Sequence, residues 1–418
     1  MANCRGEIDL LYIIAIGILL LLYVWSFYNI PILVAGAKHA PDKNREDEGT
    51  TTFHGKSPSI SIIVPMRDEE KFVYRFVEAF LKLDYPPEKL EMIIVEDGSV
   101  DGTVEMCTEY SRRYPSRIRL MSRSVSEGKP SALNYGLRHV RGELVAVFDA
   151  DSVPEPMALL KAVKYFEEPS IVAVQGRTRS INENQSLLSR LVSYEESITF
   201  ETYLQGKDAL RLFVPLTGSC YFVRRSAIEE VGGWDDDSLA EDAEMSIELT
   251  LKGHRVKYAP DVQSWQESSA KVSQLVGQRT RWFRGCMELA LEYGKLATKL
   301  DRKNVDIEFT LAGSFMFPLC LLGLAIGMYG FLVPVEPDFV SEIMTPIKSS
   351  LTIILLLITG TTLVYVTRQR KKTDLIRLPL IYAYWIIEAF IATYAFGQII
   401  LRRPRKWTRT KKTGAVAS

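Results

Sequence analysis

The stretch Leu144-Val145-Ala146-Val147-Phe148-Asp149-Ala150-Asp151 decides the fold class of this chain of 418 residues. Its five apolar residues predict a short buried strand, and an acidic pair follows that strand directly. Two earlier apolar runs, 59–64 and 91–95, are likewise followed by turn residues and then by a helical pattern. Strand, turn and helix repeated in this order predict an α/β domain with a mostly parallel sheet and helices on both faces.

Acidic residues stand after each of the three predicted strands. Asp68 follows the first strand, Asp97 the second and Asp149 the third. Because ligands of such sheets bind beyond the carboxyl ends of the strands, we expect these residues to lie around one site. Gly98 permits a tight turn, which places Asp97 to accept hydrogen bonds from a nucleobase or a ribose. Asp68 and Asp97 are therefore candidate ligand-binding residues.

Asp149 and Asp151 are candidate metal ligands. Two carboxylates two residues apart, on a chain that leaves a strand, can reach the same Mg²⁺ or Mn²⁺, which are hard cations that prefer oxygen. A bound diphosphate would complete the coordination, and the metal would neutralise the charge that develops on it as a leaving group. The alternative is a solvated turn in which an Asp and Ser152 cap the next helix.

Two further groups of charged residues begin predicted helices. Lys129 lies in the run 127–134 and is a candidate diphosphate contact, because its charge and the free amides of a helix N-terminus both favour an anion. A solvated surface lysine is the alternative. Glu241 and Asp242 begin another helix, where acidic residues stabilise the helix dipole. In the functional interpretation they are the catalytic pair, with Asp242 as the general base that takes a proton from an acceptor hydroxyl.

The run Gln278-Arg279-Thr280-Arg281-Trp282 lies on a helical stretch shortly before an apolar segment. Trp282 offers an apolar plate for a sugar ring, Arg281 can bind phosphate oxygens, and Gln278 can donate or accept hydrogen bonds beside them. A basic and aromatic anchor next to a membrane would have the same composition.

Apolar segments bracket the polar central part of the chain. The first is long enough to span a hydrocarbon core of about 30 Å and has no clean cleavage site of a signal peptide, so we expect a retained anchor. Three more apolar segments follow the central part. The chain therefore divides into an anchor over 10–34, a linker over 35–57, a central domain over 58–285, interfacial helices over 286–306, a membrane region of about three helices over 307–401, and a basic tail over 402–418.

The charges of the connecting loops predict the orientation. The basic loop Arg368–Lys372 belongs in the cytoplasm by the positive-inside rule, and this places the central domain there too, at the cell membrane. An acidic loop precedes it on the outer side, with Glu336, Asp338 and Glu342. Four full spans would put the basic tail outside. Either the last segment does not cross fully, or the first helix dominates the orientation.

Composition excludes several functions. Lys and Arg together number 51, as do Asp and Glu, so the balance of charge predicts no nucleic-acid partner. The five cysteines are far apart and lack the spacing of zinc ligands, so neither a disulfide framework nor a zinc site is expected, and a reducing compartment fits.

The order of the motifs D-G-S, D-A-D, E-D and Q-R-T-R-W, with apolar segments after them, resembles the processive family 2 glycosyltransferases, which include cellulose, chitin, hyaluronan and poly-N-acetylglucosamine synthases. The resemblance covers residues 59–285. It implies a GT-A fold, a nucleotide-sugar donor that is usually a UDP-sugar, a divalent Mg²⁺ or Mn²⁺, and inversion at the anomeric carbon. The residue roles that it implies are uridine binding by Asp97, metal binding by Asp151, general base catalysis by Asp242, and a donor and acceptor site lined by Gln278, Arg281 and Trp282.

By this resemblance the chain is expected to add N-acetylglucosamine from UDP-GlcNAc to a growing polysaccharide acceptor, with coupled export. Its other expected partners are membrane lipids and auxiliary membrane subunits. A single transfer onto a polyprenyl phosphate or lipid is the first alternative, and an inactive membrane scaffold is the second. Glu388, inside the last apolar segment, either lines an exit route for polysaccharide or faces the lipid headgroups.

Overall fold

The computed structural model describes residues 2–39, 57–295, 301–332 and 379–405, together with the shorter pieces 351–352, 354–355, 357–362, 364–365, 376–377, 407, 409–410 and 412–414. Most of the predicted linker, the acidic loop and the basic loop Arg368–Lys372 lie outside the described residues.

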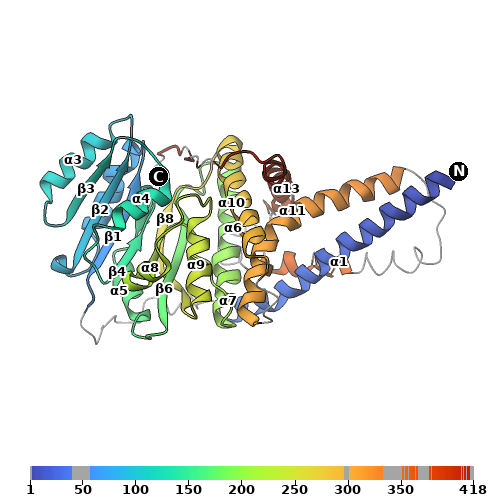
Figure 1. Cartoon of the computed structure of the whole chain (residues 1–418), viewed down its shortest axis with the longest axis horizontal. Helices are drawn as coiled ribbons and strands as arrows, with labels where there is room; N and C mark the ends of the chain where they lie inside the picture. Colours follow the sequence, from blue (N-terminus) through green and yellow to red (C-terminus); the bar gives the residue numbers. More distant parts are fainter. Residues whose placement is uncertain are drawn as a thin grey trace.

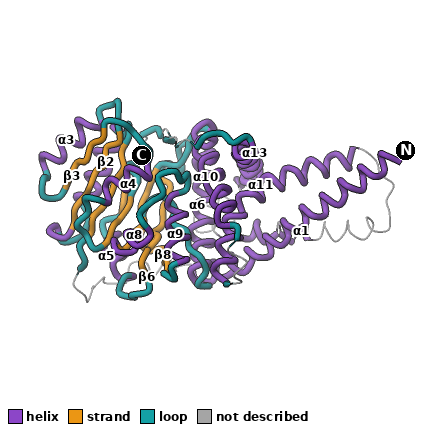
Figure 2. Tube along the Cα trace, in the orientation of Figure 1, coloured by secondary structure: helices purple, strands orange, loops and turns teal. Residues whose placement is uncertain are grey.

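An eight-stranded sheet forms the central domain, and its strands gather at one end of the molecule (Figures 1 and 2). The strand order is β3-β2-β1-β4-β7-β6-β8-β5. The bounds are β1 (Ile60–Met66), β2 (Leu90–Asp97), β3 (Ile118–Arg123), β4 (Leu144–Val147), β5 (Val153–Pro154), β6 (Ile171–Ser180), β7 (Tyr221–Arg224) and β8 (Arg255–Gln266).

The sheet is mixed. Strands β3, β2, β1 and β4 are parallel to one another, as are β6 and β8, whereas β7 is antiparallel to both of its neighbours and β5 is antiparallel to β8. The prediction of an α/β domain is confirmed, with this antiparallel component added. The reversed direction of β7 has a consequence for the site, since Tyr221 at its start pairs with Val147 at the end of β4.

Alternate strand residues enter two hydrophobic cores, one on each face of the sheet, as the period of a strand requires. In β1, Ile62 and Val64 pack into one core and Ile63 into the other. Helices cover both faces: α2 (Glu70–Leu81), α3 (Thr103–Arg113) and α5 (Ala158–Tyr165) contribute to the first core, and α4 (Lys129–Leu137), α8 (Arg225–Val231) and α9 (Glu241–Leu251) to the second. A short 3₁₀ helix, η2 (Pro87–Lys89), precedes β2.

A second layer of helices joins the sheet domain to the apolar helices. It contains α6 (Leu187–Ile198), the π-helical turn η3 (Thr199–Leu204), α7 (Gln205–Ala209), α10 (Val272–Tyr293) and α13 (Pro379–Ile400). Beyond it, α1 (Ala2–His39) and α11 (Arg302–Leu332) extend side by side away from the sheet (Figure 1). By length and composition, residues 13–39, 302–329 and 379–400 are each apolar enough to cross a membrane.

Close backbone contact fixes α1 on this layer. A Cβ atom built on Gly206 of α7 would lie 1.9 Å from the carbonyl oxygen of Ile32, so only glycine permits this approach. A buried ion pair fixes α11 in the same region, because Nζ of Lys207 lies 2.8 Å from Oδ1 of Asp306. The two long helices are thus held to the second layer of helices at their inner ends.

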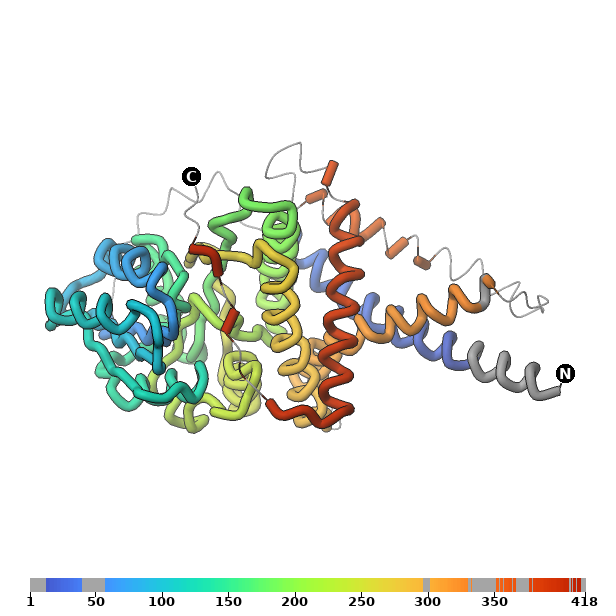
Figure 3. Tube along the Cα trace, turned by 90° about the horizontal axis from the view of Figure 1, so that it is seen from above, coloured from blue at the N-terminus to red at the C-terminus, as the bar shows by residue number. Residues whose placement is uncertain are grey.

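The direction of α13 differs from that of α1 and α11. Figures 1 and 3 together show α13 running across the direction of the two extended helices and beside α10, against which it packs. After α13 the tail returns to the sheet domain, where Lys412 forms an ion pair with Asp151. The tail and the sheet domain therefore lie on the same side of any membrane that α1 and α11 cross.

Candidate active site

Lys129 stands at the centre of the site. It is the first residue of α4 and follows Gly128, whose φ of +99° belongs to the left-handed region that favours glycine. Its Nζ lies 3.2 Å from Asp149, 3.4 Å from Asp242 and 3.5 Å from Glu241, and it donates a hydrogen bond of 2.7 Å to the carbonyl oxygen of Gly218. The lysine therefore joins the end of β4 to the start of α9.

The charges around Lys129 shift two pKa values. Burial alone would lower the pKa of Lys129, but the carboxylates of Asp149, Asp242 and Glu241 raise it above its usual value. Burial and the charge of Asp242 raise the pKa of Glu241 to about 7, against the opposing effects of Lys129 and Arg281. Glu241 thus holds its proton over part of the neutral range, and a permanent ammonium faces the carboxylate of Asp242.

A chain of donors orients Asp242. The hydroxyl of Tyr221 donates to Oδ1 of Asp242, and the indole Nε1 of Trp234 donates to the Tyr221 oxygen over 3.1 Å. All three side chains are buried. Oδ1 is engaged in this way, whereas Oδ2 faces Lys129 and accepts a hydrogen bond of 3.4 Å from its Nζ.

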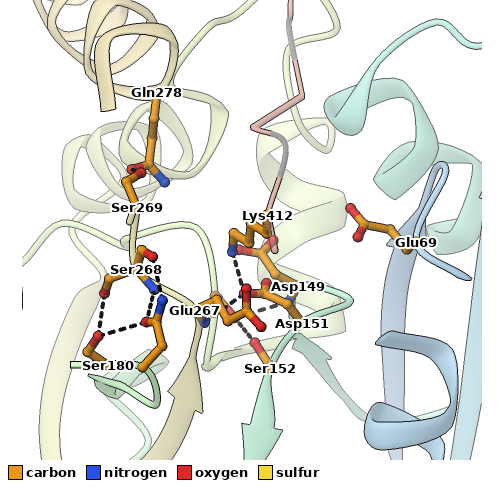
Figure 4. A network of polar contacts seen from close by, with 12 residues as sticks. Glu69, Asp149, Asp151, Ser152, Ser180, Glu267, Ser268, Ser269, Gln278 and Lys412 are labelled. Carbon is orange, nitrogen blue, oxygen red and sulfur yellow. Dashed lines mark hydrogen bonds and ion pairs between the residues drawn. The ribbon is translucent and has the colours of Figure 1, made fainter. Parts of the chain in front are cut away.

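Asp151 already binds a cation of the chain itself. Its Oδ2 accepts a hydrogen bond of 2.9 Å from the backbone of Glu267 and forms an ion pair with Nζ of Lys412 (Figure 4). Oε2 of Glu267 in turn accepts hydrogen bonds of 3.1 and 3.2 Å from the backbones of Thr413 and Gly414. The ammonium shows that this position accepts positive charge.

The residues fit a divalent metal that a substrate helps to hold. In the described part of the chain no group of three His, Cys, Asp or Glu side chains is arranged to hold a metal ion alone. Asp149 and Asp151 flank one turn after β4, and the carboxylate of Asp149 is one-third exposed. Magnesium is commonly bound by one or two carboxylates together with substrate phosphates. Asp149 and Asp151 would hold the metal in this way.

Asp97 and Asp68 lie at the ends of β2 and β1 as the sequence predicts. Asp97 is buried, with Nε of Arg123 2.9 Å and the hydroxyl of Ser126 2.6 Å from its carboxylate oxygens. Asp68 has a φ of +51° and accepts a hydrogen bond of 2.8 Å from the backbone of Val100. Both carboxylates therefore shape the turns at the carboxyl edge of the sheet.

The run Gln278–Trp282 divides between two faces of α10. Gln278 accepts a hydrogen bond of 3.2 Å from Ser269, and Arg281 donates to the carbonyl of Leu239, two residues before Glu241. Arg279 projects from another face, and its guanidinium lies 4.5 Å from the ring centre of Trp282, which follows Gln278 by one turn and is 38% exposed. Gln278 and Arg281 therefore contact the segments that flank the site, whereas Trp282 contacts the guanidinium of Arg279.

Arg279 belongs to a separate polar cluster between α6, α10 and α13. Its Nε lies 3.0 Å from Glu388 and its Nη2 pairs with Glu195. The hydroxyl of Tyr384 lies 2.8 Å from Glu195 and 2.7 Å from Glu388, within hydrogen-bond distance of both carboxyl groups. Glu388 therefore has partners within the protein.

Several site residues were not identified from the sequence. No local motif marks the four residues that were missed, which are Tyr221, Trp234, Glu267 and Lys412. Tyr221 reaches the site because β7 is antiparallel to β4, and Lys412 reaches it because the tail returns to the sheet domain. Glu69 had a local signal, since it lies next to Asp68 after β1. Burial raises its pKa to about 8, opposed by Arg409 and reinforced by Asp151 and Asp149.

The model of the family described as "Glycosyltransferase like family 2" matches residues 58–285, more than half of the chain. The chain is a family 2 glycosyltransferase. Over 303 residues the enzyme is 30% identical to a probable glycosyltransferase, YdaM, of Bacillus subtilis, which covers 71% of this chain and 72% of that protein.

Other relatives differ in their named products. The β-monoglucosyldiacylglycerol synthase of Nostoc is 29% identical over 64% of this glycosyltransferase and 58% of its own length. The poly-β-1,6-N-acetyl-D-glucosamine synthase of Staphylococcus epidermidis is 28% identical over 57% of each chain. The enzyme therefore spans less than two thirds of either protein.

A solved structure shares the fold. The mannosyltransferase PcManGT of Pyrobaculum calidifontis, in complex with GDP-Man and Mn²⁺, matches 94% of this glycosyltransferase and 99% of its own chain, with a TM-score of 0.59 and 20% identity. At this identity the likeness concerns the fold, and it confirms the GT-A architecture expected from the sequence.

Proposed function

We propose that this glycosyltransferase moves a sugar, with inversion, from a nucleoside diphosphate sugar to a hydroxyl group of an acceptor held at the membrane surface. The placement of Lys129 carries the proposal. Its ammonium lies between Asp149, on the metal side, and Asp242, on the base side. A diphosphate bound at Lys129 and at the N-terminus of α4 would have its leaving oxygen next to a cation and its sugar next to the base.

The roles of the other residues follow from their contacts. Oδ2 of Asp242 takes the acceptor proton while Tyr221 holds Oδ1. Arg281 contacts Leu239 just before α9 and Gln278 contacts Ser269 just after β8, and both are proposed to contribute to the donor and acceptor side. Asp97 and Asp68 are proposed to bind the nucleoside. A divalent Mg²⁺ or Mn²⁺ at Asp149 and Asp151 would neutralise the charge of the departing diphosphate.

We take the acceptor to be a growing polysaccharide and the donor to be UDP-GlcNAc. The relative that makes poly-β-1,6-N-acetyl-D-glucosamine supports this choice, as does the Gln278–Trp282 run beside the site. We place the enzyme as a multi-pass protein of the cell membrane with its catalytic domain in the cytoplasm. The basic tail supports this orientation, because it contacts the catalytic domain and so lies on the same side.

A lipid acceptor is the second candidate. α13 runs across the direction of α1 and α11 and beside α10, and under this candidate function we propose that it lies along the membrane surface. Such a helix would place the site at the level of the lipid headgroups. The similarity to β-monoglucosyldiacylglycerol synthases supports the same interpretation.

The test uses the purified enzyme in detergent with Mn²⁺ or Mg²⁺ and a panel of labelled UDP- and GDP-sugars. Products are separated by size and by extraction into organic solvent. A ladder of polymer from one donor supports the polysaccharide acceptor. A single sugar in the lipid fraction supports the second candidate. Release of free sugar as the only product from every donor would contradict both candidates.

A further inference from the structure

The turn 217–220 leads into β7 and contacts two charged parts of the candidate active site. The carbonyl oxygen of Gly218 accepts the hydrogen bond of 2.7 Å from Nζ of Lys129. The hydroxyl of Ser219 accepts a hydrogen bond of 3.0 Å from the backbone N–H of Asp149. The turn therefore links the first residue of α4 to the acidic residues that follow β4.

Two residues of this turn have a backbone conformation that needs support from the surroundings. Gly218 has a φ of +90° and Cys220 a φ of +54°, and residues other than glycine rarely adopt the left-handed region. Strand β6 lies close against the turn. The N–H of Gly176 donates a hydrogen bond of 2.8 Å to the carbonyl oxygen of Cys220, and a Cβ atom built on Gly176 would lie 2.6 Å from Sγ of Cys220. Strained conformations persist where the surrounding structure over-determines them in this way.

The side chain of Gln175, in β6, binds both ends of the same turn. It is fully buried, and its Oε1 accepts a hydrogen bond of 2.8 Å from the N–H of Thr217. Its Nε2 donates to the carbonyl oxygens of Gly176 and Ser219 over 2.8 and 3.0 Å. An amide carries donors and an acceptor on one planar group, so it matches an N–H at one end of the turn and carbonyl oxygens at the other.

We propose that Gln175 is a positioning residue for sugar transfer, which acts by holding the turn 217–220 against Lys129 and Asp149. The inference rests on the proposed roles of Lys129 in binding the diphosphate and of Asp149 in binding the metal. If the turn relaxes, the Gly218 carbonyl moves away from the ammonium, and the backbone of Asp149 loses its hydroxyl partner. A displacement of about 1 Å in an active site can lower the rate about 10²-fold.

Gln175→Leu removes both hydrogen-bonding groups and keeps most of the side-chain volume. With the full-length enzyme in detergent, the backbone amide of Thr217 should exchange with deuterium faster than in the wild type. The affinity for UDP with saturating Mn²⁺, measured by calorimetry, should fall about tenfold. The kcat with the donor selected from the sugar panel should fall about 10²-fold. Gln205→Leu is the matched control and should change none of these quantities, because Oε1 of Gln205 in α7 is buried and has no hydrogen-bond partner within the described residues.

Gln175→Glu adds a readout that depends on pH. A protonated glutamic acid has one donor and one acceptor, so it can still bind the N–H of Thr217 and the carbonyl oxygen of Ser219. An ionised side chain only accepts, and it would face the carbonyl oxygens that bind Nε2 in the wild type. Burial raises the pKa of such a carboxyl group. Transfer by Gln175→Glu should therefore be close to the wild type at pH 6 and should approach that of Gln175→Leu at pH 9.

Other titratable or charged side chains near position 175 are the same in both proteins. They are Arg177 of β6, Tyr221 of β7, Tyr258 of β8 and Glu201 of η3, which pairs with Arg177. Burial raises the pKa of both tyrosines, and Glu241, with a pKa of about 7, titrates in this pH range in the wild type as well. The difference between the two pH profiles therefore reports the residue at position 175.

The affinity for UDP separates positioning from a loss of stability. A variant that is only less stable contains fewer folded molecules, but those that fold bind UDP as tightly as the wild type. Unchanged UDP affinity and unchanged kcat per folded molecule in Gln175→Leu would overturn the inference and leave the proposed function intact. Unchanged exchange at Thr217, or a Gln175→Glu enzyme as slow as Gln175→Leu at pH 6, would overturn it as well. A wild-type enzyme that neither binds UDP nor transfers sugar would contradict the proposed function and this inference together.

Discussion

The buried hydroxyl of Tyr221 donates its hydrogen to Oδ1 of Asp242. An ionised carboxylate can only accept, and the Tyr221 oxygen at the same time accepts a hydrogen bond from Nε1 of Trp234. Burial and the neighbouring charge of Asp242 raise the pKa of Tyr221, so the hydroxyl keeps its proton. Tyr221 is therefore a positioning residue for the proposed base, which it holds with Oδ2 toward the acceptor side.

Tyr221→Phe should shift the acidic limb of the pH dependence of kcat upward by about one pH unit. A donor to the charged form of a carboxylate lowers the pKa of that carboxylate, and hydrogen bonds to charged groups are worth about 1.5–3 kcal/mol. The base would then ionise at higher pH. The measurement is kcat at saturating donor between pH 5 and 8.

Tyr258→Phe is the matched control. Tyr258 is as buried as Tyr221, and its hydroxyl has no hydrogen-bond partner within the described residues. Its removal should leave the acidic limb in place. A limb that shifts equally in both variants would mean that Tyr221 acts through packing alone.

Asp242→Asn should reduce transfer by about 10²–10⁴-fold while UDP binding stays near normal, because a general base acts mainly in the transition state. Loss of the negative charge also leaves Lys129 with Asp149 and Glu241 as partners. UDP binding is measured by calorimetry and transfer by labelled product. Strongly weakened UDP binding would assign Asp242 to the donor site instead.

Asp151→Ala should abolish the dependence of UDP binding on Mn²⁺. The variant loses the carboxylate proposed to hold the metal, and no metal can then bridge to the diphosphate. Calorimetric titration of UDP with and without Mn²⁺ is the measurement. Asp261→Asn serves as the control, because the carboxylate of Asp261 is bonded to Tyr165 over 2.5 Å and is not one of the proposed metal ligands. Unchanged Mn²⁺-dependent binding in Asp151→Ala would exclude Asp151 as a ligand.

The pKa of Glu69 gives a prediction about stability and pH. The pKa rises from 4.5 to about 8 on folding, chiefly through burial. Between these values the folded state holds a proton that the unfolded state releases, so the free energy of unfolding falls as pH rises. The Tm of the metal-free enzyme in detergent should therefore decrease between pH 5 and 8.

Glu69→Gln removes the titrating group and should flatten this decrease. Glu109→Gln, on the exposed surface of α3, should keep the slope of the wild type. The same slope in Glu69→Gln and the wild type would show that other groups cause the pH dependence.

Local patterns were sufficient to predict the parallel strands of the fold. They also predicted the location of most acidic residues of the candidate site, at the carboxyl ends of these strands. Asp68, Asp97 and Asp149 each follow a buried apolar run, and parallel strands bring their carboxyl ends to one edge. Glu241 and Asp242 lie in the first turn of α9, where acidic residues favour the helix dipole, and Lys129 begins α4 next to Pro130, a residue common at helix starts.

Contacts between distant segments could not be predicted in this way. Tyr221 reaches Asp242 because β7 runs antiparallel to its neighbours, and no short pattern fixes strand direction. Lys412 reaches Asp151 across 261 residues of sequence, from a polar tail without periodicity. Which residues of Gln278–Trp282 face the site likewise depends on how α10 packs against α13. The composition of the run does not predict that packing.

Substitution of Glu388 tests whether the carboxyl group that this residue of α13 presents to Arg279 has a structural role. Glu388 is buried and lies 3.0 Å from Arg279, so Glu388→Gln removes the more buried of the two carboxylates that pair with this guanidinium. Loss of one member of a buried ion pair costs about 3–5 kcal/mol. The Tm in detergent should fall clearly. Glu195→Gln should cost less, because Glu195 is 20% exposed and water replaces the lost interaction. If Glu388→Gln keeps the wild-type Tm but loses polymer length, Glu388 contacts the acceptor instead, and the exit route considered from the sequence regains support.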